Sequence, residues 1–239
     1  MPSHKLVNRS VVVGFLVAIP VLTRTSWAQE TPDSYSDLLR KAIVGARIDR
    51  GGTFRLLYPS AGWHPPGPQF SCVRGLGNGP AAPFLIDVLR DGPGWSDAEL
   101  PKGKGNLYRY VARCYAALGL GSTSDSRAFE PLLAIVTNAD IKPYEYRVDR
   151  PTQKGQYNLR CYAAFALGIL GDQRAVEPLE STLKREGFVE CAYALARLHA
   201  VPAAPTIISV ASARNLFTVD LHQCLEYMLR TKFDLLIAA

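Results

Sequence analysis

One long segment of the chain occurs twice. The stretches RCYAALGLGSTSDSRAFEPLLAIV, from Arg113, and RCYAAFALGILGDQRAVEPLESTL, from Arg160, lie 47 residues apart and are identical at 13 of 24 positions without a gap. Repetition on this scale is typical of proteins in which one small structural unit is stacked on the next, so that neighbouring units bury a continuous core. The chain is therefore expected to be a repeat protein.

Weaker copies flank these two segments. At twice the spacing, 94 residues, the segment from Gly77 to Leu85 falls on the one that begins at Gly171. Downstream, residues 194–198 and 203–204 match residues 166–170 and 175–176 at a spacing of only 28. The shortest spacing predicts that the unit is a helical hairpin. About 19 residues (47 minus 28) are extra in the longer spacings and are expected to form loops between units.

Each unit has the pattern of two packed helices. Residues 161–170 carry no charge and are rich in alanine, which predicts a slim first helix that packs on several sides. Gly171 and Asp172 then break the helix and offer a cap for the next one. An apolar stripe from Ala175 to Leu183 predicts a half-exposed second helix. It must begin near Ala175, because Pro178 is tolerated only in a first helical turn.

These residues also carry a resemblance to a known family. The pattern RxxAAxALGxLGDxRAxEPLxxxL, from Arg160 to Leu183, resembles the HEAT-like repeat of phycobilin lyase subunits and of many bacterial scaffold proteins. The resemblance implies an all-α fold, an α–α superhelix of stacked helical hairpins, here with long inter-repeat loops. It implies a role that is usually protein binding and sometimes chromophore or enzyme work. No catalytic residue is implied, because the matched positions are those that pack the repeat.

The first 28 residues have the pattern of a signal peptide. Lys5 and Arg9 precede an apolar run over residues 11–22, and Ser26-Trp27-Ala28 provides small residues where a signal peptidase cleaves. The apolar run is too short for a stable membrane anchor, which needs about 20 residues. We therefore expect export, to the periplasm or the cell exterior.

The rest of the chain is expected to form one array with covered ends. Residues 29–68 are interpreted as an N-terminal helical cap, over 35–48, followed by a Pro/Gly-rich connector over 58–68. Residues 69–239 are interpreted as the HEAT-like repeat domain, which closes with a capping helix over 220–239. Removal of the first 28 residues lowers the net charge from +6 to +3, because three basic residues leave with them. This balance does not favour nucleic acid as a partner.

The inter-repeat loops contain the candidate binding residues. Aromatic side chains and arginine together are typical of binding hot spots. The loop over 91–105 contains Trp95, and the loop over 138–156 contains Lys142, Tyr144, Tyr146, Arg147 and Arg150. The alternative interpretation is that the rings fold back over the edge of the hairpins while the charges keep a long loop soluble.

The sequence does not assign a disulfide or a metal site to the five cysteines. Cys114 and Cys161 occupy the same position in consecutive units, which favours small buried hydrophobic side chains over a disulfide between them. No pairing of the five can be assigned. His222 and Cys224 offer two metal ligands where a structural zinc site needs four, so we expect no metal and no cofactor.

Two smaller expectations concern polar residues of the repeat. Arg127 with Glu130, and Arg174 with Glu177, have the i, i+3 spacing of surface salt bridges on a helix. His199 falls where the other repeat has Gly171, which predicts a turn residue.

The function expected from the sequence is that of a non-catalytic scaffold module that binds a protein partner through its surface and its inter-repeat loops. Two alternatives remain open at this point. One is a lyase-like protein that holds a hydrophobic cofactor, and the other is a thiol or metal enzyme.

Overall fold

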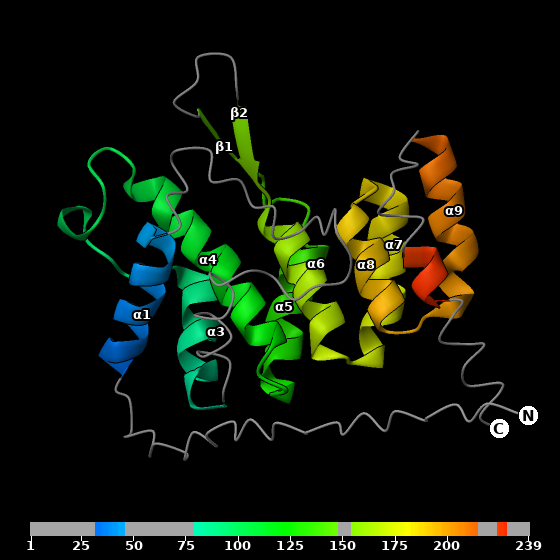
Figure 1. Ribbon diagram of the computed structural model, residues 1–239, viewed down its shortest axis with the longest axis horizontal. Helices are drawn as coiled ribbons and strands as arrows, with labels where there is room; N and C mark the ends of the chain where they lie inside the picture. The colour runs from blue at the N-terminus through cyan, green and yellow to red at the C-terminus, as the bar shows by residue number, and fades with distance from the viewer. Residues whose placement is uncertain (1–31, 46–78, 148–153, 215–223, 229–239) are drawn as a thin grey trace, which may run out of the picture. The chain divides into compact units, whose positions relative to one another are not determined.

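The computed structural model describes residues 32–45, 79–147, 154–214 and 224–228 (Figure 1). The expected signal peptide, the connector over 58–68 and most of the expected C-terminal cap lie outside these ranges. Residues 224–228 form a short helical segment within that expected cap. Among the described helices, none has the length and apolar character needed to cross a membrane.

The described chain is mostly helical, as expected for a HEAT-like all-α fold. The helices are α1 (Pro32–Gly45), α3 (Ala82–Asp91), α4 (Gly105–Gly121), α5 (Phe129–Thr137), α6 (Leu159–Leu170), α7 (Val176–Glu186), α8 (Val189–Arg197) and α9 (Ala204–Ala213). The predicted first and second helices of the central unit correspond to α6 and α7, and Pro178 lies in the first turn of α7. The predicted N-terminal helix begins at residue 32 rather than 35.

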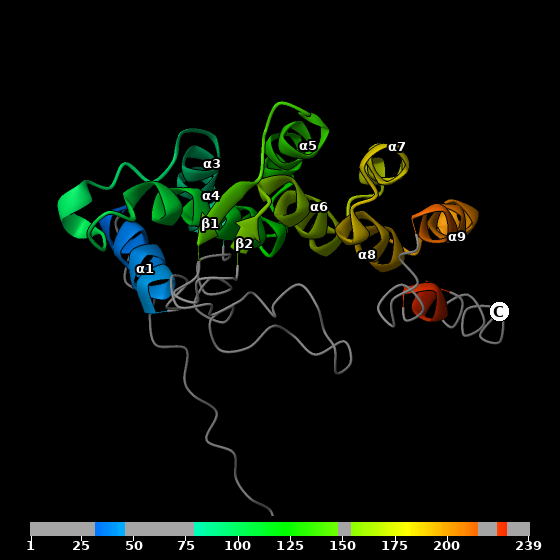
Figure 2. The same ribbon diagram turned by 90° about the horizontal axis from the view of Figure 1, so that it is seen from above.

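The helices form two layers. Helices α4, α6 and α8 pack on one another in succession, and α3, α5 and α7 pack against α4, α6 and α8 respectively. Figure 2 shows α3, α5 and α7 on one side of the row formed by α4, α6 and α8. At the N-terminal side, α1 packs on α4 through the buried side chains of Leu39 and Ile43. Each hairpin of the array thus contributes one inner and one outer helix.

The turn between the two helices repeats with the spacing found in the sequence. A short 3-10 turn precedes α3, α5, α7 and α9. These turns span Gly79–Ala81, Ser126–Ala128, Gln173–Ala175 and Val201–Ala203, and they begin 47, 47 and 28 residues apart. In two of them an aspartate caps the turn, because the carboxylates of Asp125 and Asp172 accept the backbone N–H two residues later at 2.9 Å. The predicted periodicity and the Asp172 cap are confirmed.

In three of the turns, the residue before the capping position has a left-handed backbone. Gly171 has a φ of +80°, and Ser124 and His199, at the equivalent positions, both have a φ of +52°. The left-handed region is costly for residues with a Cβ, so the fold of the turn overrides the local preference of Ser124 and His199. The prediction of His199 as a turn residue is confirmed.

The repeated arginines bond the aspartate two residues before them and not the glutamate three residues after them, so the predicted i, i+3 salt bridges are wrong. Arg174 instead lies 3.7 Å from Glu130 of the preceding unit. The guanidinium of Arg127 lies 2.7 Å from the carboxylate of Asp125, and that of Arg174 lies 2.7 Å from Asp172. The reason is local, because the backbone N–H of the arginine is already bonded to this carboxylate and the side chain closes on both of its oxygens. Arg174 also covers the ring of Phe129, at 4.0 Å, and so links two units.

A second repeated arginine explains the start of the RCYAA motif. Arg113 Nε donates to the carbonyl of Leu89 at 2.8 Å, and Arg160 Nε donates to the carbonyl of Val136 at 3.1 Å. Both acceptors lie in the last turn of the preceding unit's second helix, where carbonyl groups lack a partner within the helix. Arg113, midway along α4, and Arg160, at the start of α6, therefore bind these two first helices to the preceding unit.

Small residues set the distance between successive first helices. A Cβ added to Gly121 would lie 2.7 Å from the carbonyl oxygen of Ala166, and one added to Gly168 would lie 2.5 Å from the Cα of Ala194. Gly121 and Gly168 are equivalent residues of the repeat at the spacing of 47, and Ala166 and Ala194 are equivalent at the spacing of 28. The backbones of α4, α6 and α8 thus approach one another through a glycine–alanine contact that occurs twice.

We predict that Gly168→Ala lowers the free energy of unfolding by about 1–3 kcal/mol, because the added methyl group collides with the α8 backbone. This loss is expected although alanine has the higher helix propensity by about 1 kcal/mol. Urea unfolding of the two proteins measures the change. Ala134→Leu, which enlarges an exposed side chain of α5, serves as the control and should change stability by less than about 0.5 kcal/mol. A Gly168→Ala variant as stable as the wild type would contradict the close approach.

Candidate functional site

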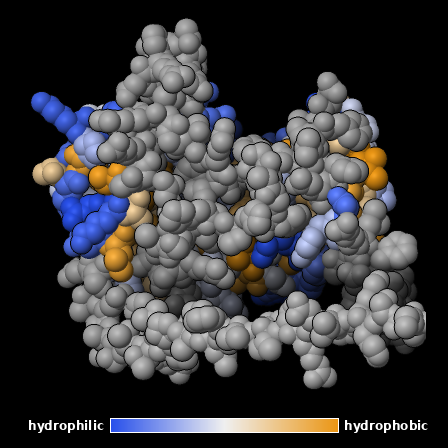
Figure 3. Space-filling model, in the orientation of Figure 1, coloured by the Kyte–Doolittle hydropathy of each residue, from blue (hydrophilic) through white to orange (hydrophobic). Residues whose placement is uncertain are grey.

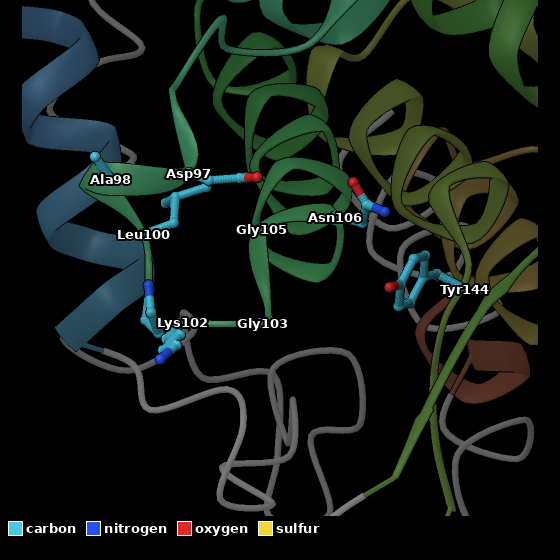
Figure 4. Close-up of a pocket in the computed structure, with 9 residues that line it drawn as sticks. Asp97, Ala98, Leu100, Lys102, Gly103, Gly105, Asn106 and Tyr144 are labelled. Carbon is cyan, nitrogen blue, oxygen red and sulfur yellow. The ribbon is translucent and has the colours of Figure 1, made fainter.

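The candidate site is a cleft of about 600 Å³ between an inter-repeat loop and a β-hairpin (Figure 4). The loop precedes α4, and the hairpin lies in the long connection between α5 and α6. The cleft has polar side chains from both. Its described lining consists of Asp97, Ala98, Leu100, Pro101, Lys102, Gly103, Gly105, Asn106 and Tyr144.

The loop before α4 is held in place by Trp95 and Arg109. The indole of Trp95 is 5% exposed, and its Nε1 donates to Ser36 Oγ of α1 at 2.8 Å. Arg109, in the first turns of α4, donates to the carbonyl oxygen of Trp95 at 2.9 and 2.7 Å and to the Asp97 carboxylate at 2.7 Å. One side of the cleft is thereby joined to both α1 and α4.

A reciprocal cap shapes the same loop. The backbone N–H and the hydroxyl of Ser96 both donate to the Glu99 carboxylate at 2.8 Å. These bonds hold the pKa of Glu99 below its usual value, the backbone bond contributing most, and Arg40 of α1 lies 3.4 Å from the same carboxylate. Gly105 leaves room for the Asp97 carboxylate, which a Cβ at this position would meet. The loop therefore has a fixed shape before any partner binds.

The other side of the cleft is a two-stranded antiparallel sheet. Strands β1 (Tyr144–Arg147) and β2 (Lys154–Tyr157) pair Tyr144 with Tyr157 and Arg147 with Lys154. Because successive residues of a strand point to opposite faces, Tyr144, Tyr146 and Tyr157 share one face. Tyr146 stacks on Tyr157 with ring centroids 5.1 Å apart, and all three rings pack against the core. Two strands were not expected in this loop.

Tyr110 joins the hairpin to the helices. Its hydroxyl donates to the carbonyl of Lys142 at 3.0 Å and accepts the backbone N–H of Leu159 at 3.1 Å, while its ring lies 5.4 Å from that of Tyr144. Burial raises the pKa of Tyr110 to about 12, so the hydroxyl keeps its proton for the bond to Lys142 at physiological pH. Tyr110 thus ties α4, the entry of the hairpin and the start of α6 together.

The structure brings together only some of the predicted binding residues. Tyr144 lines the cleft, whereas Lys142, two residues earlier, is exposed and does not belong to the lining. Tyr146 is half-buried on the hairpin, and Arg147 ends β1. Arg150 lies outside the described residues. Trp95 takes the alternative role considered for it, because its ring is buried under the loop and offers no surface to a partner.

Three residues of the site were not singled out from the sequence. Lys102 and Asn106 line the cleft, and Tyr110 supports it. The basic segment Pro101–Gly105 is visible in the sequence, but its place beside the hairpin depends on the packing of two separate loops. Tyr110 resembles any other core aromatic residue of a first helix, so no local pattern distinguishes it.

The described cysteines lie away from this cleft. Cys114, Cys161, Cys191 and Cys224 are all buried, as expected for Cys114 and Cys161, while Cys72 lies outside the described residues. Burial raises the pKa of Cys114, Cys161 and Cys191 above the usual range, so these thiols are not activated nucleophiles. In the described ranges, no group of three or more His, Cys, Asp or Glu residues is placed to hold a metal ion.

A comparison with known protein families also identifies a HEAT-like repeat in this chain. Residues 159–185, which span α6 and α7, match the family model described as PBS lyase HEAT-like repeat. No curated protein matches the chain. The chain thus contains a HEAT-like repeat within a helical array, as the resemblance implied.

We predict that Tyr110→Phe lowers the free energy of unfolding by about 1–2 kcal/mol, because the Lys142 carbonyl and the Leu159 N–H each lose a partner. The loss should also speed amide hydrogen exchange in residues 142–147 and 154–157. Tyr144→Phe is the matched control, since it removes a hydroxyl with no recorded bond and keeps the ring contact. Unchanged exchange in the hairpin of Tyr110→Phe would show that the hydroxyl does not anchor it.

Proposed function

We propose that this protein is an exported, non-catalytic module that binds a protein partner at the cleft between the loop before α4 and the hairpin. HEAT-like repeats form helical scaffold and interaction modules, which is the coarse function that the repeat supports. Repeat proteins of this kind often bind through the insertions that project from one edge of the array. The cleft is built from two such insertions.

The observation that carries the proposal is the fixed shape of both walls of the cleft. Trp95, Arg109 and Glu99 are all used to hold the loop, and Tyr110 holds the hairpin. Loops that need not be ordered on binding lose less conformational entropy, so a preformed surface binds more tightly for the same contacts. A loop that only had to stay soluble would not need this set of hydrogen-bonded anchors.

The chemistry of the lining suits contact with a polypeptide. The side-chain amide of Asn106 can donate and accept hydrogen bonds. Tyr144 provides an aromatic ring and a hydroxyl group, and Lys102 provides a positive charge. Figure 4 shows the Tyr144 hydroxyl directed toward the side of the cleft formed by Gly103 and Asn106. Tyrosine contributes a large contact area at a low entropic cost, which is typical of residues at the centre of interfaces.

We expect Asn106→Arg to abolish partner binding, because the larger side chain fills the cleft from an exposed position of α4. The test is capture from extracts of the producing cells with the immobilised mature chain, followed by quantitative mass spectrometry. Ser181→Arg, an equal change on the exposed face of α7, is the control. A specific partner should be recovered by the wild type and the control and reduced at least tenfold with Asn106→Arg. Equal recovery by all three proteins, or no specific partner, would overturn the proposal.

The export part of the proposal is tested by the intact mass of the protein recovered outside the cytoplasm. The signal-peptide pattern predicts a chain that begins at Gln29. A chain that retains residues 1–28, or that stays in the cytoplasm, would contradict export and leave the binding proposal to stand separately.

A further inference from the structure

Among the described residues, no strand pairs with the second edge of β1, which begins at the cleft. In the described part of the chain the sheet contains two strands, so β1 pairs with β2 on one side and with no strand on the other. β1 contacts α4, and its first residue, Tyr144, lines the cleft. Figure 1 shows the hairpin rising beyond the ends of α4 and α6. An edge strand presents N–H and C=O groups that can pair with an added strand.

The dimensions suit a short extended segment. The four residues of β1 extend over about 13 Å at roughly 3.3 Å per residue. The cleft of about 600 Å³ meets this strand at its first residue, Tyr144, and is lined on the other side by the loop that contains Asp97 and Lys102. A partner strand of four or five residues could therefore bond to β1 through its backbone and direct alternate side chains into the cleft.

Two lysines near this edge carry positive charges that no carboxylate of the described residues neutralises. Lys102 lines the cleft and Lys142 precedes β1, and both are exposed with no carboxylate partner within the described ranges. The Nζ of Lys142 donates only to the carbonyl of Ala139, at 3.1 Å. The exposed charges of Lys102, in the lining, and of Lys142, two residues before Tyr144, are thus available to a ligand.

The nearby acidic groups do not offset these charges. Asp97 is bonded to Arg109, and Glu99 is bonded to Ser96 and Arg40. Glu145 is exposed, but it points to the face of the hairpin opposite Tyr144, because side chains alternate along the strand. Asp140 lies in the turn before the hairpin and is not part of the lining. Complementarity therefore favours an acidic ligand.

From this juxtaposition we infer that the cleft binds an extended, acidic segment of the partner protein, which adds to the free edge of β1 as a third strand. Its carboxylates face Lys102 and Lys142, and its backbone bonds to β1. This mode uses main-chain hydrogen bonds for affinity and alternate side chains for specificity. The inference rests on the proposed function and specifies the chemistry of the partner.

The test is a selection from a random 12-residue peptide library against the mature chain. The wild type should enrich sequences with Asp or Glu at alternate positions and without proline in the acidic stretch. A synthetic copy of the enriched sequence should bind the Lys102→Glu/Lys142→Glu variant at least tenfold more weakly. Lys184→Glu/Arg197→Glu, which reverses two exposed charges away from the cleft, is the control and should bind like the wild type.

A second measurement separates strand addition from simple charge attraction. N-methylation of alternate amides of the selected peptide keeps its charge and removes backbone donors, and it should lower affinity at least tenfold in one of the two registers. Equal binding of both methylated peptides would overturn strand addition. Enrichment of basic or apolar sequences, no enrichment, or equal binding by the charge-reversed variant would overturn the inference as a whole.

The two proposals fail in different ways. If a partner is captured and lost with Asn106→Arg while the library gives no acidic sequence, the proposed function stands and this inference fails. If capture is unaffected by Asn106→Arg, binding at the cleft itself is excluded.

Discussion

The close contact between glycine and alanine on successive first helices is the constraint on which the rest of the array depends. Gly121 and Gly168 have no room for a Cβ against Ala166 and Ala194, so the backbones of α4, α6 and α8 meet with almost nothing between them. α4 and α6 also reach the last turn of the preceding second helix, where Arg113 and Arg160 donate to the carbonyl groups of Leu89 and Val136. The need for close helix packing and for these arginine hydrogen bonds therefore explains why the same glycine, alanine and arginine residues recur in both copies of the motif.

The same constraint determines where long connections can be inserted between the helices. The inner helices leave no space for extra residues, so the long connections must leave the array at the ends of the helices. There they are not loose, because Trp95 and Arg109 hold one connection and Tyr110 holds the other. Figure 3 shows both hydrophilic and hydrophobic patches on the described surface at the left of the view. The buried apolar residues form one core cluster. The proposed binding site is thus a rigid extension of the repeat rather than part of the repeat itself.

Sequence reasoning succeeded where the signal is local and periodic. The spacings of 47 and 28 located the helix pairs, the turn at Gly171 and the Asp172 cap, because each is set by residues a few positions apart. It left two roles open for Trp95, partner binding and burial against the hairpins, because the hydrogen-bond partner that decides between them, Ser36, is 59 residues away. Nor could it foresee the hairpin, since its tyrosines are held by contacts with Tyr110 and Tyr162 of two different helices. The long-range half of the site became visible only in the structure.

The central claim is that a partner occupies the edge of the array that lies between the loop before α4 and β1. The most direct measurement is amide hydrogen exchange of the intact mature chain with and without its captured partner. The account predicts slower exchange in residues 101–106 and 142–147 of the complex, with little change on the outer faces of α5 and α7. Protection confined to α5 and α7, with unchanged exchange at the loop and the hairpin, would contradict it.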